Sequence, residues 1–432
     1  MSCKWTTQKL GDLCDEITVG FVGSMTKEYV DKGIPFFRSK NISEYEINWD
    51  DIKYVSPEFH KKLKKSSLSS GDVAIVRTGK PGTCCVIPEN IKEANCSDIV
   101  IVRVDKAKLC PHYLSFFMNS MANHQVSSRL VGAVQQHFNV SAAKQIEIPL
   151  PSLDEQNEIA HVLKTISDKI FVNTETNQTL EEMAQAIFKS WFVDFDPVKA
   201  KMNGERPEGM DAATASLFPE KLVDSELGLI PDGWEIHKTQ DLFDVKDGTH
   251  DSPKKTEEGH YLVTSKHITK GKIDTSSAYL ISDADFEKVN QRSKVDTFDI
   301  LLTMIGTVGE VVVVYDNPVE FAIKNVGLFK TSQRPELVWL FYWHLQSFKM
   351  KHYLEVRMAG TTQQYLTLKT LRTIPVVLPS EELLSKFNNV MSPLMEKISD
   401  NHKQTQTLSN LRDTLLPKLL SGEIELETAT EN

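Results

Sequence analysis

The sequence predicts an α+β protein: two similar globular α/β domains joined by two long helices that form an antiparallel coiled coil, with a pseudo-two-fold internal repeat. Three observations carry this prediction: ordered landmarks that occur twice, short apolar runs bounded by turn residues, and two heptad-spaced segments. We expect globular domains at 1–151 and 233–379, helices at 152–195 and 380–422, a linker at 196–232 and a tail at 423–432.

The internal repeat rests on five landmarks that follow the same order in both halves. The separation within each pair is nearly constant, and it is far too long for a solenoid, so it indicates two copies of one domain-plus-helix unit. The paired landmarks are Trp5 and Trp234, Arg38–Ile42 and Thr264–Ile268, Asp72-Val73 and Asp299-Ile300, Gly132–Gln136 and Gly360–Gln364, and Pro151 and Pro379.

Each globular domain is expected to mix strands with aromatic-rich helices. The apolar runs Asp98–Val104, Ile300–Ile305 and Glu310–Val314 have the length and composition of buried strands. The segments Lys106–Asn119 and Pro335–Lys351 are predicted to be helices. Together these segments indicate a compact α/β domain in each copy.

The two long helices are predicted from core residues whose spacing alternates between four and three, which is the heptad seam of a coiled coil. The seams of the two copies match position for position, without a gap, at the spacing of the internal repeat. The first seam comprises Ile159, Leu163, Ile166, Ile170, Asn173, Asn177, Leu180, Ala184, Ile187 and Trp191, and the second comprises Phe387, Met391, Leu394, Ile398, Asn401, Thr405, Leu408, Arg412, Leu415 and Leu419. Buried asparagines at 173 and 401 would fix the register, and the alternative is a frayed, solvated seam.

A connecting segment lies between the first helix and the second globular domain. Residues 194–232 contain four prolines and scattered glycines, which favours irregular structure over a continuous helix. We interpret the segment as an ordered linker that crosses from one end of the coil to the other.

Composition limits the possible classes of protein. A net charge of −10 argues against a protein that simply coats DNA, and only residues 1–150 are basic, with 19 Lys and Arg against 16 Asp and Glu. A basic partner would therefore supply much of any attraction to phosphate. No segment is apolar enough to span a bilayer and the start has no signal core, so a cytoplasmic location is expected. All cysteines lie within residues 1–110 without metal-ligand spacing, which favours buried free thiols over a zinc site.

No sequence motif typical of catalysis stands out. Thr78–Thr83 resembles a phosphate-binding loop only in composition, and its glycines have the wrong spacing. There is no nucleophile elbow and no Pro-Pro-Tyr stretch of the kind that adenine methyltransferases carry. Asp244-Val245-Lys246 could seed a nuclease motif, but such a triplet is common. We expect no catalytic residue, metal ligand or cofactor in this chain.

Two similar domains on a rigid rod would meet two patches of one DNA duplex, and their different surface residues would then read an asymmetric target. The candidate DNA contacts are polar and loop-borne. They are Arg38, Lys40, Asn41, Lys61, Lys62, Lys64, Lys65, Arg77, Lys80, Gln135, Gln136 and His137 in the first domain, and His250, Lys254, Lys255, Lys266, His267, Gln363, Gln364 and Tyr365 in the second. The lysine run could instead be a solvated helix face, and the glutamines could close each domain onto its helix.

Several segments resemble the specificity subunits of type I restriction-modification systems. The resemblance covers nearly the whole chain and rests on Ile148–Pro151 with Glu155-Gln156, Ala186–Pro197, Phe218-Pro219, Gly228–Trp234, Gly360–Gln363, Leu411-Arg412 and Leu419–Glu423. Two segments depart from the family pattern: the second copy has Glu381-Glu382-Leu383 where the first has Leu153–Gln156, and the first copy has Val134 where the second has Thr362. Both departures concern motifs at the domain–helix junction.

The resemblance implies a non-catalytic subunit that reads a bipartite, asymmetric DNA target. It further implies two methyltransferase subunits docked on the helices and motor-nuclease subunits in the same complex. S-adenosylmethionine, ATP and magnesium would then bind the partner subunits and not this chain. The competing interpretations are a coiled-coil scaffold without DNA specificity and a catalytic DNA-modifying enzyme.

Overall fold

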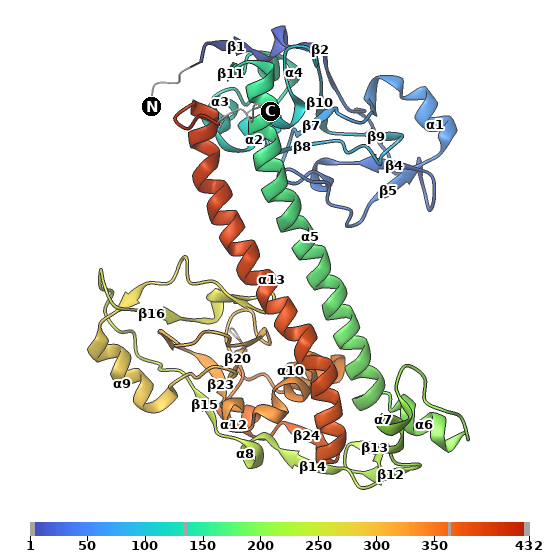
Figure 1. Ribbon diagram of the computed structural model, residues 1–432, viewed down its shortest axis with the longest axis vertical. Coiled ribbons are helices and arrows are strands. Elements are labelled where there is room, and N and C mark those ends of the chain that lie inside the picture. Colours follow the sequence, from blue (N-terminus) through green and yellow to red (C-terminus); the bar gives the residue numbers. More distant parts are fainter. Residues whose placement is uncertain (1–4, 133–135, 362–363, 427–432) are drawn as a thin grey trace, which may run out of the picture. The chain divides into compact units, whose positions relative to one another are not determined.

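The computed structural model describes residues 5–132, 136–361 and 364–426, and it divides into two compact units. Unit 1 comprises residues 1–174 and 402–432, and unit 2 comprises residues 175–401. Each unit therefore contains one globular domain together with parts of both long helices (Figure 1).

The described residues of unit 1 form a four-stranded sheet, a five-stranded sheet and one strand pair. The first is antiparallel, with the strand order β2 (Cys14–Val19), β10 (Ile99–Val104), β7 (Val73–Val76), β8 (Cys84–Val86). The second has the order β3 (Tyr29–Val30), β5 (Lys53–Val55), β4 (Ile34–Phe37), β9 (Ala94–Cys96), β6 (Ser67–Leu68), and in it β4 and β9 run parallel. Strand β1 (Thr7–Lys9) pairs with β11 (Glu147–Pro149). The helical elements are η1 (Leu10–Asp12), η2 (Ser39–Asn41), α1 (Pro57–Lys62), η3 (Lys64–Ser66), α2 (Pro111–Ser120), α3 (Asn123–Ser127), α4 (Val140–Lys144) and the first part of α5 (Leu153–Phe192).

Unit 2 has the same plan. Its antiparallel sheet has the order β15 (Val245–Asp247), β23 (Val326–Phe329), β20 (Ile300–Thr303), β21 (Val311–Val313). The smaller sheets are β19 (Leu280–Ile281), β16 (His260–Val263), β22 (Phe321–Ile323), in which β16 and β22 run parallel, and the pairs β17 (Ile268–Thr269) with β18 (Lys272–Ile273), β14 (Glu235–Lys238) with β24 (Pro375–Leu378), and β12 (Leu222–Ser225) with β13 (Gly228–Pro231). The helical elements are α6 (Asp196–Met202), α7 (Ala212–Ser216), α8 (Thr239–Leu242), η4 (Ser265–His267), α9 (Asp283–Ser293), η5 (Thr331–Gln333), η6 (Pro335–Leu337), α10 (Val338–Gln346), α11 (Phe348–Glu355), α12 (Leu368–Arg372) and the first part of α13 (Glu381–Ser421).

The internal repeat is confirmed by the strand order of the two main sheets. The strands β2, β10, β7 and β8 of unit 1 occupy the positions of β15, β23, β20 and β21 in unit 2. The central strands β7 and β20 begin at Val73 and Ile300, which are the two members of one predicted landmark pair. The fold class is therefore the duplicated α+β architecture that the sequence predicts.

Both faces of each main sheet are buried, which explains why its strands are continuous apolar runs. In unit 1, Val73 and Ile75 face a core that also contains α2 and residues of both long helices. The intervening Ala74 and Val76 face the second sheet, where they pack with Phe37. The same alternation separates the two faces of β20 in unit 2.

Two predicted helices differ from the sequence pattern, one in where it starts and the other in being interrupted. The first begins at Pro111 and not at Lys106, because the Asp105 side chain accepts a hydrogen bond from the Ala107 amide and holds a turn there. The predicted helix at 335–351 consists of a short 3-10 turn followed by α10 and α11. It breaks at Ser347, whose hydroxyl caps the next helix by accepting from the Met350 amide at 3.3 Å.

The predicted seams are buried or half-buried throughout, so the frayed alternative is wrong. In unit 1, Leu163 of α5 shares a core with Leu416 and Leu419 of α13. In unit 2, the Phe188 and Phe387 rings pack with their centroids 6.4 Å apart. In each unit, residue numbers rise along one helix in the direction in which they fall along the other. The two helices therefore pair antiparallel.

The predicted crossing of the 194–232 segment is wrong. The end of α5 and the start of the second globular domain lie side by side in unit 2, where the Phe192 and Trp234 rings are 5.6 Å apart. The rings of Trp191 and Phe218 pack at 5.3 Å, so the intervening α6 and α7 are held by the same aromatic cluster. The segment folds back onto the helix end instead of running along the coil.

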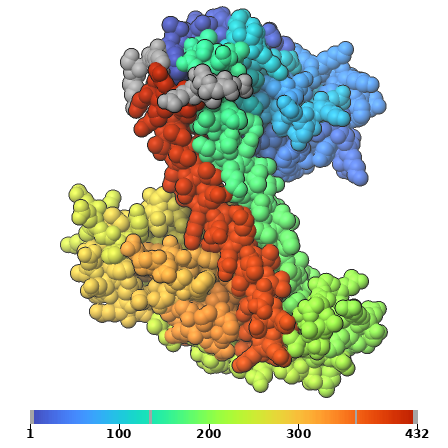
Figure 2. Space-filling model, in the orientation of Figure 1, coloured from blue at the N-terminus to red at the C-terminus, as the bar shows by residue number. Residues whose placement is uncertain are grey.

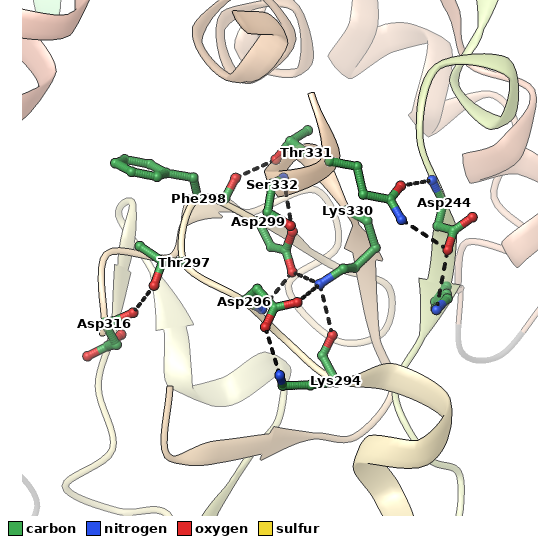
Figure 3. A network of polar contacts seen from close by, with 12 residues as sticks. Asp244, Lys294, Asp296, Thr297, Phe298, Asp299, Asp316, Lys330, Thr331 and Ser332 are labelled. Atoms are coloured by element: carbon green, nitrogen blue, oxygen red, sulfur yellow. Dashed lines mark hydrogen bonds and ion pairs between the residues drawn. The ribbon is translucent and has the colours of Figure 1, made fainter. Parts of the chain in front are cut away.

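A buried ion pair recurs in the two domains. In unit 2, Lys330 Nζ lies 2.5 Å from carboxylate oxygens of both Asp296 and Asp299 (Figure 3), and Asp299 is fully buried. In unit 1, Arg103 Nε lies 3.6 Å from the buried Asp72 at the equivalent place. Burial tends to raise the pKa of Asp296, but the hydrogen bond and attraction from Lys330 outweigh it and hold that pKa below its usual range.

Cysteine side chains are largely inside unit 1. Cys84, Cys85, Cys96 and Cys110 are buried free thiols, as predicted, and Cys14 is half-buried. Burial raises the pKa of Cys84 to about 12, so this thiol is unreactive. Among the described residues, no helix is both long and apolar enough to cross a membrane.

Candidate nucleic-acid interface

A surface loop leaves the main sheet at the same point in each unit, directly after a glycine. A Cβ atom on Gly20 would lie 2.9 Å from the Cys96 carbonyl oxygen, and one on Gly248 would lie 2.4 Å from the Ile323 oxygen. Such distances leave no room for a side chain, so only glycine allows the strand end to pass so close to the neighbouring sheet. The loops that follow, at 21–28 and 249–256, therefore start from a fixed position.

In each domain, one residue with a left-handed backbone conformation holds the surface turns together. Asp98 and Asn325 occupy equivalent positions of the repeat, each directly before a central strand, and both have φ of 54°. In unit 1, Asp98 accepts hydrogen bonds from the hydroxyls of Ser39, at 3.1 Å to its carboxylate, and of Thr78. In unit 2, Asn325 Oδ1 lies 2.8 Å from His250 Nδ1. This position thus links the predicted contact segments within each domain.

The loops that carry the predicted glutamines join the same surfaces. In unit 1, a bridge between Val131 and His137 closes the loop, and the Phe138 amide donates to the Arg77 carbonyl at 2.9 Å. In unit 2, Tyr365 forms bridges with Ala359 and Ile305. The predicted segments around residues 77 and 137 are therefore neighbours, as are their counterparts around 305 and 365.

Three cations in unit 1 share one carboxylate. Asp51 pairs with Lys40, with Lys53 at 2.6 Å and with Arg38 at 3.3 Å. Hydrogen bonds from Lys40 and Lys53 hold the pKa of Asp51 well below its usual range, so the carboxylate stays ionised at neutral pH. The charge of this turn is thus partly neutralised before any ligand binds.

The structure gives two predicted contacts a different role. Asn41 is fully buried, and its amide donates to the carbonyls of Asn48 and Asp50, both at 3.1 Å. His267 is 1% exposed, and its Nδ1 accepts from the Thr264 amide at 2.9 Å. Burial lowers the pKa of His267, which favours the neutral ring that this bond requires. Both side chains close their turns instead of facing a ligand.

Most of the remaining predicted contacts are accessible. Gln135 and Gln363 lie outside the described residues. Arg38, Arg77 and His137 are half-buried, and the Arg77 Nε is buried without a hydrogen-bond partner among the described residues. The exposed ones are Lys40, Lys61, Lys62, Lys64, Lys65, Lys80, Gln136, His250, Lys254, Lys255, Lys266, Gln364 and Tyr365. Lys61 to Lys65 form a separate group on α1 and η3, on the side of unit 1 away from α5 (Figure 1).

Sequence reasoning missed the residues that position these side chains. Asp51, Asp98 and Asn325 act through contacts that span 11 to 75 residues of sequence, and such contacts leave no local pattern. Arg292 of α9 was also missed because it sits in an ordinary polar helix, where a surface role is the default. The one available signal was the paired position of Asp98 and Asn325 in the repeat.

The interface has the chemistry of a binding surface. Its exposed side chains are amides, lysines, histidine and tyrosine, which bond to base edges and phosphates in protein–DNA complexes. Within the described residues, no group of three or more His, Cys, Asp or Glu side chains is arranged to hold a metal ion.

Comparisons with known proteins agree with this architecture. The family model described as "Type I restriction modification DNA specificity domain" matches residues 3–182 and again 231–410. The chain is 27% identical to the MjaIX type I restriction enzyme specificity subunit of Methanocaldococcus jannaschii, over 98% of this chain and 94% of that relative. It is 26% identical to the HindI specificity subunit of Haemophilus influenzae, over 66% of this chain and 70% of the relative. The fold is similar to the crystal structure of the type I restriction-modification S subunit from M. genitalium, with a TM-score of 0.63, 16% identity and 96% of each chain covered.

Proposed function

The chain belongs to the type I restriction-modification DNA specificity domain family and carries that domain twice, and from this we propose that each domain reads one half of a split DNA target. Members of this family recognise DNA sequence and leave the chemistry to other subunits. The finer features, a bipartite and asymmetric target and the partners named below, are our inference from the two units.

The observation that carries the proposal is that the same scaffold presents different side chains in the two domains. The hydroxyls of the equivalent residues Ser39 and Ser265 donate to the backbone carbonyls of Asp98 and Asn325, so the same framework contact occurs in both domains. The loop after Gly20 exposes Val22, whereas the loop after Gly248 exposes His250. Because the two domains share a framework but expose different contact residues, we infer that they read two half-sites of different sequence.

We further propose that the long helices bind two methyltransferase subunits, with motor-nuclease subunits completing the complex. Figure 2 shows that both helices expose one side along their length. Apolar side chains on those helices are partly exposed: Phe171, Val172, Met183, Val390 and Leu411. Residues 151–210 carry 11 acidic and 6 basic residues, which suits contact with protein better than contact with DNA. S-adenosylmethionine, ATP and magnesium would bind the partners, and we place the complex in the cytoplasm.

The test is a domain exchange in the assembled complex. Residues 1–151 are replaced by the corresponding domain of another member of the family, and methylated adenines are mapped in host DNA. One half of the methylated motif should change while the other half and the partner subunits stay the same. A motif that changes in both halves, or in neither, would contradict the assignment of one half-site to each domain. A parallel exchange of residues 233–379 should change the other half.

A further inference from the structure

A surface cleft in unit 2 lies between the loop after Gly248 and helix α9. Its volume is about 560 Å³, and its lining includes Lys254 of the loop and Lys288 and Arg292 of the helix. Helix α9 lies on the side of unit 2 away from α5 and α13 (Figure 1), and the segment around residues 250–290, yellow in Figure 2, forms part of the outer surface. The cleft is therefore open to a large ligand.

Asp247 fixes Arg292, which lines this cleft, and His250 of the adjoining loop. Asp247 ends strand β15 and is only 5% exposed, so its carboxylate is immobile. One oxygen accepts from the Arg292 guanidinium, and the other lies 3.1 Å from His250 Nε2. Asn325 holds the opposite ring nitrogen of His250. A loop residue and a helix residue are thus oriented by one buried carboxylate.

Arg292 keeps most of its hydrogen-bonding capacity. Its side chain is 55% exposed, and only one terminal nitrogen is engaged by Asp247. Its other nitrogens have no partner in the described part of the chain. A guanidinium with one edge anchored and another edge open is pre-organised for a pair of acceptors in one plane.

The charges of the cleft favour a base edge over a phosphate. Lys254, Lys288 and Arg292 are offset by the carboxylates of Asp251 and Asp285, which line the same cleft. A phosphate would gain little from this balance, because the two carboxylates repel it. A base edge carries no net charge and can use acceptors and donors together.

We propose that Arg292, oriented by Asp247, reads a guanine through its O6 and N7 atoms in the half-site bound by the second domain, with His250 beside it. The inference rests on the proposed function and adds to it one residue and one base. Arg paired with guanine is the commonest specific contact in the major groove, and the open edge of Arg292 has the required two donors.

The described residues of the first domain contain no counterpart of this arrangement. Val19 stands at the position of Asp247, and the exposed Val22 lies near the position of His250. Helix α1 has 6 residues where α9 has 11, so it lacks the turn that carries Arg292. The guanine is therefore assigned to the second half-site only.

The test uses the purified complex with its partner subunits and duplexes in which one base pair of the second half-site is varied at a time. The wild type should prefer guanine at one position by roughly tenfold or more, the value of one bidentate pair. Arg292→Ala should bring that preference close to parity and leave every other position and the first half-site unchanged. Asp247→Asn should weaken the same preference. Arg334→Ala, which removes an arginine paired with Glu336 outside the cleft, is the matched control and should change nothing.

A probe on the DNA keeps the test independent of protein folding. Replacing the guanine by 7-deazaguanine removes N7, and it should weaken binding by the wild type but not by Arg292→Ala. An equal loss of affinity for every sequence would identify a phosphate contact and overturn the inference, as would an unchanged preference. If the wild-type complex showed no sequence preference in either half-site, the proposed function itself would fail.

Discussion

Asn401 donates a hydrogen bond from Nδ2 to Asn177 Oδ1 at 2.8 Å, and both side chains are buried between the long helices of unit 2. Asn177 in turn donates to the Ile398 carbonyl at 3.1 Å. In unit 1, Asn173 donates to Gln404 at 2.9 Å. A slip of either helix would leave these amides unpaired, so each unit fixes the register of its own helix segments.

Asn401→Ala should lower the free energy of unfolding by about 1–3 kcal/mol, because it leaves the buried Asn177 Oδ1 without its donor. Replacing both Asn177 and Asn401 by leucine should restore most of that loss, since two apolar groups then fill the site. Denaturant unfolding of the chain measures both effects. Asn389→Ala removes an exposed asparagine of the same helix and serves as the control. A loss no larger than that of the control would show that the amide pair is not a stabilising contact.

Lys330→Met should destabilise unit 2 by about 3–5 kcal/mol at pH 7, because it leaves the fully buried Asp299 carboxylate without its cation. Lys330→Arg introduces the residue type found at the equivalent position 103, and it should reduce the free energy of unfolding much less. The folded pKa of Asp296 lies below its unfolded value, so its contribution is present above about pH 4 and disappears as the pH falls through the folded pKa. The difference in the free energy of unfolding between wild type and Lys330→Met should therefore become smaller in acid. Urea midpoints at pH 7 and pH 4 provide the comparison, and a gap that widens in acid would contradict the ion-pair account.

Asp51→Asn should strengthen DNA binding by the complex several-fold, because it releases Lys40, Lys53 and Arg38 from a shared carboxylate. The dependence of affinity on salt should become steeper by about one unit of slope for each cation that then reaches a phosphate. Titrations at several salt concentrations measure the slope, with the exposed Glu89→Gln as the control. Since the pKa of Asp51 is already below its usual range, lowering the pH from 8 to 6 should not reproduce the effect. Weaker binding by Asp51→Asn would mean that the carboxylate orients the cations productively.

Insertion of one heptad after Asn177 and another after Lys397, which lie at the same level of the antiparallel helices, should change the preferred spacing between half-sites. A whole heptad keeps the seam in phase and lengthens each helix by about 10 Å, or about three base pairs of DNA. The same change turns the duplex by about 100°, so affinity for the best spacer should also fall. Binding to duplexes whose spacer is varied one base pair at a time reports the optimum. An optimum that stays at the parental spacing, with undiminished affinity, would show that helix length does not set the distance.

The predictable parts of the molecule are those with a regular period. The seams of α5 and α13 could be located because the same heptad pattern occurs twice, and β20 and β21 because both faces of the sheet are apolar. The start of α2 was misplaced because a single Asp105 hydrogen bond outweighs an apolar pattern that continues through it.

Site residues were harder to predict than the fold. Asn and His are residue types that often contact DNA. The side chains of Asn41 and His267 nevertheless form hydrogen bonds with the backbone of their own turns. Conversely, the pairing of Arg292 with Asp247 joins residues 45 positions apart. Polar side chains of the same type serve both purposes, and only the three-dimensional contacts distinguish them.

The glycines at 20 and 248 have a consequence for how such a protein can change. A loop leaves the main sheet directly after each glycine. Asp98 and Asn325, which lie before the neighbouring strand, contact the surface turns beside that loop. Because each loop starts from a fixed point of the framework, the segments 21–28 and 249–256 can vary in length and composition at little cost to the core. New DNA preferences could thus arise by exchanging short loop cassettes, without redesigning the domain that carries them.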